Sequence, residues 1–377
     1  MPAITAGLAG RLTIDLGALK LNWLALDRVG QAAITGAVVK ANGYGLGLEP
    51  VSEALFAAGA RFFFVATPDE GLTVRRLLPK AHIFVLDGLF PGAAALYSTE
   101  RLMPVLSSLD MLDEWLAHCV TTGNAWPAAL HFDTGMNRLG FRLNETAKVK
   151  QMIEQPGWKP EVVMSHFACA DEPMHEKNRA QLILFHGVMQ SFPGIPASMA
   201  NSAAILTARE HHFQLLRPGI AVYGGRAVSG RPSLMQRVVG LEIPVLQVKE
   251  ARAGETVGYG ATQTLSRDSR LGIIALGYAD GFFRALSSTN NRIGGKAAFR
   301  GRLIPVAGRV SMDLVALDLT DLGADLPRPG EMVEILGATL SVDDQADAAG
   351  TIGYEILTSL KGRYDRVFVD SLGAAQN

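Results

Sequence analysis

The sequence contains little cysteine and no imbalance of charge. Only two cysteines, Cys119 and Cys169, occur among 377 residues, and neither lies at a spacing typical of zinc ligands or of a redox pair. The sequence therefore predicts no metal site, and the scarcity of cysteine favours a reducing compartment. Charged residues make up 19% with a formal net charge of -1, and no basic run carries interleaved aromatics. These features argue against binding to nucleic acid or to a membrane surface.

Long apolar segments are also absent. No stretch reaches the roughly 18 apolar residues that a membrane-spanning helix requires. The first residues, MPAITAGLAGRLTIDLG, are small and apolar, but they lack a basic start and are interrupted by Gly7 and Gly10. No signal peptide is predicted from such a pattern, and we expect a cytoplasmic protein.

What the sequence does have is a high apolar content, 48%, in a regular order. A chain of this length exceeds what one core usually supports, so two domains are expected. Strand-like runs mostly alternate with helical runs from residue 37 to residue 224, which predicts a parallel (β/α)8 barrel, with a doubly wound open sheet as the alternative. The eight strand candidates are residues 37–39, 61–67, 82–88, 102–108, 128–135, 161–168, 197–202 and 213–224.

The pattern changes after residues 229–233. Strands separated by Gly, Pro and Asp turns follow, with one clear helix at residues 354–364. We therefore predict a barrel domain over residues 1–230 and a mostly-β domain over residues 231–377. The opening strand at residues 10–17 precedes the barrel and is a candidate to pair with the second domain.

Polar residues gather where the predicted barrel strands end, which is where barrel enzymes carry their functional groups. The glycines of the stretch AVVKANGYGLG let backbone approach a ligand closely, and Lys40 ends its strand. Further polar groups follow later strands, and these are Asp133, Arg138, His166, Asn201, Ser202 and the RPGI stretch at 217–220. We expect them to share one end of the barrel.

Two of these features indicate a cofactor. The loops after the seventh and eighth strands supply Asn201, Ser202, Gly219 and Ile220, and a hydroxyl with glycine backbone amides suits an anion. Lys40 at the same mouth suggests a Schiff base to an aldehyde. Pyridoxal 5'-phosphate satisfies both requirements.

With these stretches in place, the chain resembles the alanine racemase family, whose members combine a β/α barrel with a β-rich domain. The resemblance covers essentially the whole length. It rests on the ordered stretches AVVKANGYG, DTGMNRLGF, SHFACAD, ANSAA, RPGIAVYG, GYADGF, GRVSMD and TIGYEIL.

The resemblance implies roles for individual residues. Lys40 would form the Schiff base and act as one catalytic base, and Tyr278, supplied by the partner subunit of a homodimer, would be the second. Arg217 would face the pyridine nitrogen, and His166 would link Arg217 to Tyr278. The phosphate would be bound by Tyr44, Ser202, Gly219, Ile220 and Tyr354, and the substrate carboxylate by Arg138 and the backbone amide of Met312.

The chemistry explains why two bases are needed. Racemisation removes a proton from one face of the α-carbon and returns one on the other face, so groups on both faces are required. Lysine and tyrosine both have ordinary pKa values of about 10, so their surroundings must lower them. The resemblance implies that the reaction is the interconversion of L-alanine and D-alanine, which in bacteria would supply D-alanine for peptidoglycan.

Some positions depart from the family pattern. The family usually has a lysine, often carbamylated, where this chain has His131, and that lysine orients the substrate-binding arginine. Leu46 and Thr358 replace a usual histidine and a frequent cysteine. We expect His211 and His212 to be exposed to solvent and not to bind metal.

Three alternatives remain at this point. The chain is also compatible with a racemase for another or several amino acids, such as serine. A non-catalytic pyridoxal-phosphate carrier would share the barrel and the lysine, but carriers resemble the barrel alone. A decarboxylase on a related two-domain plan would place a carboxylate near the pyridine nitrogen, and Arg217 argues against it.

Overall fold

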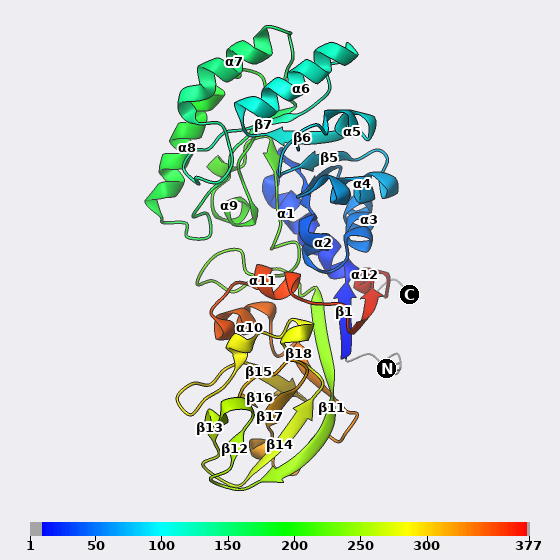
Figure 1. Ribbon diagram of the computed structural model, residues 1–377, viewed down its shortest axis with the longest axis vertical. Coiled ribbons are helices and arrows are strands. Elements are labelled where there is room, and N and C mark those ends of the chain that lie inside the picture. The colour runs from blue at the N-terminus through cyan, green and yellow to red at the C-terminus, as the bar shows by residue number, and fades with distance from the viewer. Residues whose placement is uncertain (1–9, 375–377) are drawn as a thin grey trace. The chain divides into compact units, whose positions relative to one another are not determined.

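A computed structural model describes residues 10–374 of the chain. These residues form two compact units, and Figure 1 labels many of their helices and strands. The barrel unit comprises residues 19–222 and 226–235, and the β unit comprises residues 10–18, 223–225 and 236–374.

The strands of the barrel unit form a parallel sheet that closes into a ring. Strands β3 to β9 pair in sequence order, and β10 pairs with β2. Backbone bonds continue the ring on both sides of β10, since Gly36 N–H donates to Leu216 O (2.9 Å) and Arg217 N–H donates to Ala200 O (3.0 Å). The predicted barrel is confirmed, and an open doubly wound sheet is excluded. The strands are β2 (Ile34–Thr35), β3 (Ala37–Val38), β4 (Phe62–Val65), β5 (His82–Val85), β6 (Leu102–Leu106), β7 (Ala129–His131), β8 (Val162–Met164), β9 (Ala197–Ser198) and β10 (Leu215–Leu216).

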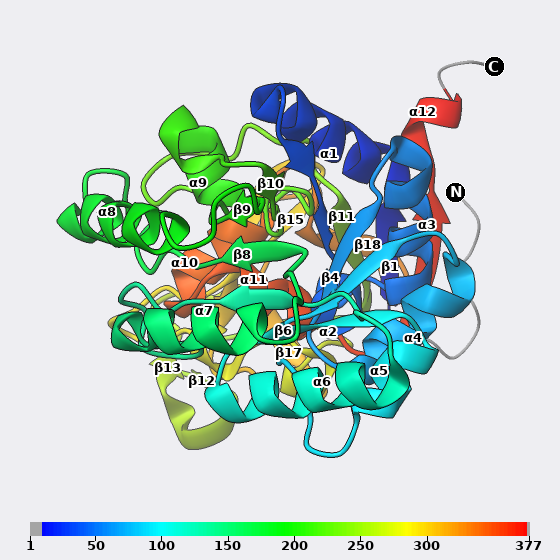
Figure 2. The ribbon, with the colours of Figure 1, turned by 90° about the horizontal axis from the view of Figure 1, so that it is seen from above.

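Helices lie outside this ring, as Figure 2 shows for α4 to α8. Side-chain caps explain where several of them begin, because a capping oxygen satisfies a backbone N–H that has no partner in the first turn. Ser108 accepts from Met111 N–H at the start of α6, and Asn201 accepts from Ala204 N–H at the start of α9. The helices are α1 (Leu16–Gly30), α2 (Lys40–Tyr44), α3 (Leu48–Ala58), α4 (Pro68–Leu77), α5 (Ala94–Thr99), α6 (Leu109–Thr122), α7 (Thr146–Glu154), α8 (Glu176–Met189) and α9 (Ser202–Thr207).

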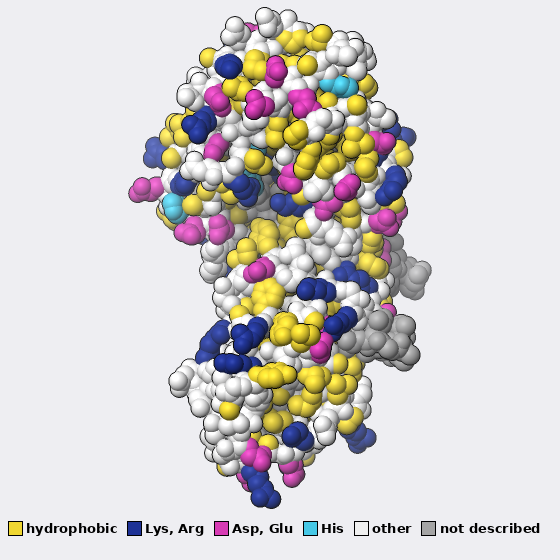
Figure 3. All heavy atoms as spheres, in the orientation of Figure 1, with side chains coloured by type: hydrophobic (Ala, Val, Ile, Leu, Met, Phe, Trp, Pro, Cys, Tyr) yellow, Lys and Arg dark blue, Asp and Glu magenta, His cyan; other side chains and the backbone are white. Residues whose placement is uncertain are grey.

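The core of the barrel unit is apolar and aromatic. Phe64 and Phe84 come from adjacent strands, are fully buried, and stack with ring centroids 5.0 Å apart. On the face shown in Figure 3, Lys and Arg side chains of this unit are interspersed with Asp, Glu and uncharged side chains.

The β unit is built around one long strand, β11 (Val239–Ala251). One end of β11 pairs with β18 and β1, and the other pairs with β14 across an irregularity between Val245 and Gln247 that changes the register. Strand β1 (Gly10–Asp15) also pairs in parallel with β19. The other strands are β12 (Thr256–Val257), β13 (Gln263–Thr264), β14 (Ser269–Ile274), β15 (Lys296–Phe299), β16 (Arg302–Ala307), β17 (Val315–Asp318), β18 (Met332–Leu336) and β19 (Tyr364–Val369).

Several local expectations are wrong. The helix predicted at residues 354–364 ends early: α11 spans Gly353–Thr358, and Tyr364 begins β19, where pairing with β1 overrides the helical spacing of Ile356, Leu357 and Leu360. The β unit also contains α10 (Val342–Ala349), capped by Ser341, and α12 (Ser371–Ala374).

The adjacent histidines are also not exposed. The exposed fractions of His211 and His212 are only 8% and 6%. His211 packs against Phe167 with ring centroids 4.8 Å apart, and the His212 ring is hydrogen-bonded to Ile205 O (2.9 Å). Both therefore belong to the interior.

Within residues 10–374, no helix has the length and apolar character needed to span a bilayer. The same residues contain no group of three or more His, Cys, Asp or Glu side chains arranged to hold a metal ion.

Candidate active site

Lys40 lies just after β3 and begins a half-buried turn whose backbone is left-handed. The four residues after it have positive φ angles: Ala41 54°, Asn42 55°, Gly43 61° and Tyr44 54°. The pKa of the Lys40 amine is lowered chiefly by burial and also by Arg138, while Asp87 and Glu70 act to raise it. A larger fraction of Lys40 is therefore neutral, which is the form that acts as a nucleophile or a base.

A small cradle lies beside this turn and is formed by Tyr44, Ser202 and the backbone at Gly219. Ser202 Oγ accepts hydrogen bonds from Gly219 N–H (2.8 Å) and Ala221 N–H (3.3 Å). A Cβ atom on Gly219 would lie 2.1 Å from the Tyr44 hydroxyl, so a side chain at position 219 has no room.

One backbone donor in this cradle has no partner among residues 10–374. Ile220 is fully buried, yet its N–H donates no hydrogen bond within the described part of the chain. Buried backbone N–H groups are almost always paired, so this one indicates a missing acceptor. Together with the hydroxyl of Ser202, it suits an anion such as a phosphate.

Arg217 lies at the centre of a buried polar network. Its guanidinium donates to Ser198 Oγ (2.5 Å), to Ser165 O (2.7 Å) and to His166 Nδ1 (3.2 Å). Burial lowers the pKa of Arg217 to about 10, and among the described residues no carboxylate pairs with it. The Nε–H is not used in these three bonds and donates to no other atom within the described structure, so it is available to a ligand.

The hydrogen bond from Arg217 determines the state of His166. Arginine can only donate, so Nδ1 of His166 must accept and its proton must sit on Nε2. Burial, with Arg217 as the next cause, lowers the pKa of His166 well below its usual value. His166 is therefore neutral near pH 7, with a fixed tautomer.

His131 lies at the end of β7 and carries no charge near neutral pH. Burial, followed by Arg217 and Arg138, lowers its pKa to about 4. It therefore cannot supply the negative charge that the resemblance implies at this position when a lysine there is carbamylated. The turn leading to Arg138 is held instead by Asp133 Oδ1, which accepts backbone bonds from residues 135, 136 and 137 (2.8, 2.8 and 3.1 Å).

In the β unit, the structure brings Tyr278 and Met312 together. Tyr278 N–H donates to Ser311 O (3.1 Å), and Ala279 N–H donates to Met312 O (3.0 Å). Gly277 permits this approach, because a Cβ atom there would lie 2.0 Å from Met312 O. Tyr278 is 40% exposed, and the Met312 N–H has no hydrogen-bond partner within residues 10–374. Both groups are accessible to a ligand.

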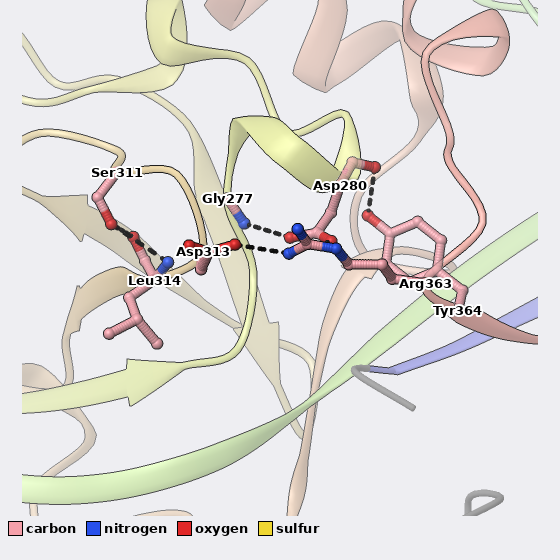
Figure 4. Close-up of polar contacts among 7 residues, drawn as sticks. All are labelled: Gly277, Asp280, Ser311, Asp313, Leu314, Arg363 and Tyr364. Carbon is pink, nitrogen blue, oxygen red and sulfur yellow. Dashed lines mark hydrogen bonds and ion pairs between the residues drawn. The ribbon is translucent and has the colours of Figure 1, made fainter. Parts of the chain in front are cut away.

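Arg363 ties these two loops together, as Figure 4 shows. Its guanidinium donates to Asp313 Oδ1 (2.6 Å), next to Met312, and pairs with Asp280 Oδ1 (3.5 Å), two residues after Tyr278. Asp280 is buried, accepts from Gly277 N–H (2.9 Å), and burial raises its pKa. Arg363 and Asp280 are not among the residues predicted from the sequence, although the two glycines and the aspartate of GYADG are typical of a turn.

The remaining candidate, Tyr354, lies in the first turn of α11 in the β unit and is 37% exposed. The structure thus groups Lys40, Tyr44, Ser202 and the 217–220 stretch in the barrel unit, with His166 and Arg138 nearby in charge interactions. It groups Tyr278 and Met312 in the β unit.

Comparison with known proteins assigns both units. Residues 14–227 match the alanine racemase N-terminal domain, and residues 238–368 match the alanine racemase C-terminal domain. The chain is 47% identical over 358 residues to an alanine racemase of Rhodospirillum rubrum, covering 94% of each chain. It is 44% identical over 366 residues to a biosynthetic alanine racemase of Agrobacterium fabrum, covering 95% of this chain and 93% of that one.

A solved structure is similar over the same extent. The crystal structure of the alanine racemase from Bartonella henselae, described as having covalently bound pyridoxal phosphate, matches with a TM-score of 0.90 and 34% identity. The match covers 96% of this chain and 99% of that one. The chain therefore belongs to the alanine racemase family.

Proposed function

We propose that the protein is a pyridoxal-phosphate-dependent alanine racemase, an isomerase that interconverts L-alanine and D-alanine. The observation that carries this proposal is the half-buried Lys40, with its lowered pKa, beside the cradle of Tyr44, Ser202, Gly219 and Ile220. Family membership and the named activity of the relatives support it. The biological role that fits is supply of D-alanine for peptidoglycan, in the cytoplasm.

The residues present fit the cofactor. Tyr44, Ser202, Gly219, Ile220 and Tyr354 would hold the phosphate, and the unpartnered Ile220 N–H within the described chain is the donor that such an anion would satisfy. When bound, pyridoxal phosphate supplies an electron sink for the charge left when the α-proton is removed. Lys40 would anchor the group covalently through its amine.

Arg217 would face the ring nitrogen through its remaining Nε–H. Because a guanidinium donates and keeps its proton, a ring nitrogen opposite it accepts a hydrogen bond and stays unprotonated. An unprotonated ring nitrogen would weaken the electron sink and disfavour transamination. A carboxylate in place of Arg217 would favour the protonated nitrogen and have the opposite effect.

Two bases would serve the two faces of the α-carbon. Lys40 would act on one face, and Tyr278 from the partner subunit of a homodimer on the other. Nδ1 of the neutral His166 accepts a hydrogen bond from Arg217 and therefore would not take up or relay a proton. Its Nε2–H would donate a hydrogen bond toward Tyr278. The substrate carboxylate would be held by Arg138 and by the free N–H of Met312.

We further propose that the domains divide at residue 230. The barrel domain would span residues 1–230 and the mostly-β domain residues 231–377, with the strand at residues 10–17 belonging to the second sheet. The pairing of β1 with β11 and β19 supports that assignment.

The test of function is formation of D-alanine from L-alanine by the purified, cofactor-loaded protein. L-serine and a panel of other amino acids run beside it would distinguish a broader racemase. Bound cofactor without any racemisation would favour the carrier alternative and would overturn the proposal.

Gly219→Ala should weaken cofactor binding, because its Cβ would collide with the Tyr44 hydroxyl at 2.1 Å and disturb the cradle. Loss of one or two charge-assisted hydrogen bonds to phosphate corresponds to a rise in Kd of about 10- to 100-fold. Titration of the apoprotein with pyridoxal phosphate, followed by absorbance, measures this rise. Gly187→Ala in α8 is the control, since a Cβ there meets nothing within 4 Å. Equal affinities for both variants would contradict the assigned cradle.

A further inference from the structure

The turn that carries Lys40 adopts a conformation that its own sequence disfavours. Four successive residues, 41–44, have left-handed backbone angles, and only Gly43 is a glycine. In Ala41, Asn42 and Tyr44 the left-handed region brings Cβ close to the following carbonyl oxygen, which is unfavourable. Contacts from outside the turn must therefore hold it.

Glu70, in the first turn of α4, provides such contacts. Its Oε1 accepts a hydrogen bond from Asn42 N–H (3.0 Å), in the middle of the left-handed turn. Its Oε2 accepts from Ala66 N–H (2.9 Å), directly after β4. One carboxylate therefore joins the turn after β3 to the end of the neighbouring barrel strand.

The side chain of Asn42 extends this link. Asn42 Oδ1 accepts from Leu48 N–H (2.9 Å), and Asn42 O accepts from Gly47 N–H (2.9 Å). Asn42 is thus bound on one side to Glu70 and on the other to the start of α3. Lys40 and Tyr44 lie two residues before and two residues after it, so its placement governs both.

We propose that Glu70 is a positioning residue for Lys40 and Tyr44, whose carboxylate holds the left-handed turn so that the amine and the phenol face the cofactor site together. This inference rests on the proposed function. It concerns how the turn is held, which neither the reaction nor the family match assigns.

Glu70 also acts on Lys40 through its charge. The charged and titratable groups around Lys40 are Arg138, His166, Asp87 and Glu70. Glu70 and Asp87 both raise the pKa of Lys40, but of these two carboxylates only Glu70 accepts a hydrogen bond from the turn within the described structure. Replacing either carboxylate by its amide therefore separates the two effects.

The first experiment measures backbone hydrogen exchange in the peptide covering residues 41–48 of the cofactor-loaded protein. Glu70→Gln keeps one acceptor oxygen but turns an NH2 group toward a backbone N–H, so one of the two bonds is lost. Loss of a bond to a charged group corresponds to about 10- to 100-fold faster exchange at Asn42. Glu70→Ala should show at least the same increase.

Two matched variants serve as controls. Asp87→Asn removes a similar charge near Lys40 without removing a hydrogen bond to the turn. Glu53→Gln removes an exposed carboxylate of α3 that lies outside the turn. Exchange at residues 41–48 should stay unchanged in both. Unchanged exchange in both Glu70 variants would overturn the proposal.

A second readout measures the charge effect of Glu70 on Lys40 separately from its hydrogen bonds to the turn. The rate at which the apoprotein captures pyridoxal phosphate depends on the neutral amine of Lys40. The pH at which the capture rate is half of its maximum follows the pKa of Lys40, which Glu70 and Asp87 both raise. Glu70→Gln and Asp87→Asn should therefore both move this midpoint to lower pH. Glu53→Gln should not move it.

The outcomes distinguish this inference from the proposed function. If Glu70→Gln exchanges faster but the wild-type protein forms no D-alanine, the positioning role stands and the alanine assignment is overturned. Full D-alanine formation with unchanged exchange in both Glu70→Gln and Glu70→Ala would overturn the positioning role alone.

Discussion

Lys40→Ala is expected to lose racemase activity by more than about 10⁴-fold, because the variant lacks both the covalent anchor and one of the two bases, and acid-base catalysis alone contributes about 10²- to 10⁴-fold. The lysine is half-buried at the end of β3, and the described charged groups that act on it are Arg138, Asp87 and Glu70. The measurement is the rate of D-alanine formation at saturating pyridoxal phosphate.

The cofactor should also become removable in this variant. Without the Lys40 amine, pyridoxal phosphate is held only by the cradle, so dialysis should strip it from Lys40→Ala and not from the wild type. Lys80→Ala, which changes an exposed lysine of the barrel unit, is the control and should keep both activity and cofactor. Activity within tenfold of wild type in Lys40→Ala would rule out this assignment of the base.

Tyr278→Phe is expected to impair proton transfer on one face of the α-carbon much more than on the other. The phenylalanine keeps the ring and removes only the hydroxyl, so the loss on the affected face should be about 10²- to 10⁴-fold. Exchange of the α-proton in deuterated water, started separately from L-alanine and from D-alanine, measures each face. Tyr259→Phe, which removes a hydroxyl from a 73% exposed tyrosine of the same unit, is the control.

Equal residual exchange from both enantiomers of alanine would contradict the two-base assignment. The proposed sharing of sites between subunits gives a second outcome. Mixing Lys40→Ala with Tyr278→Phe should restore part of the activity, because one of the two sites in a mixed dimer then has both bases intact. No recovery after demonstrated subunit exchange would refute the shared site.

Much of the barrel could be predicted because its signals are local. Short apolar runs such as FFFV and HIFV are buried on both faces, so they are recognisable as parallel strands without knowledge of their neighbours. Lys40, His166 and Ser202 each follow such a run, and in a barrel the ends of all strands share one rim. These three residues therefore lie at the same end of the barrel.

Other features arise from partners far apart in the chain. The helix predicted at residues 354–364 rests on the spacing of Ile356, Leu357 and Leu360. Tyr364 nevertheless begins a strand, because β1, more than three hundred residues earlier, offers an unpaired edge. Likewise, His211 and His212 are polar residues in the stretch REHHF, yet they are buried, His211 against Phe167 and His212 against Ile205. No local pattern contains these contacts.

The sequence by itself determined the order of strands and helices, the lysine at the first strand end, and the family to which these stretches belong. Only the tertiary structure decided that residues 41–44 are left-handed, that Glu70 holds them, and that Arg363 joins the loops of Tyr278 and Met312. The physical reason is that hydrophobic periodicity is read along the chain, whereas these hydrogen bonds and ion pairs join segments that meet only after folding.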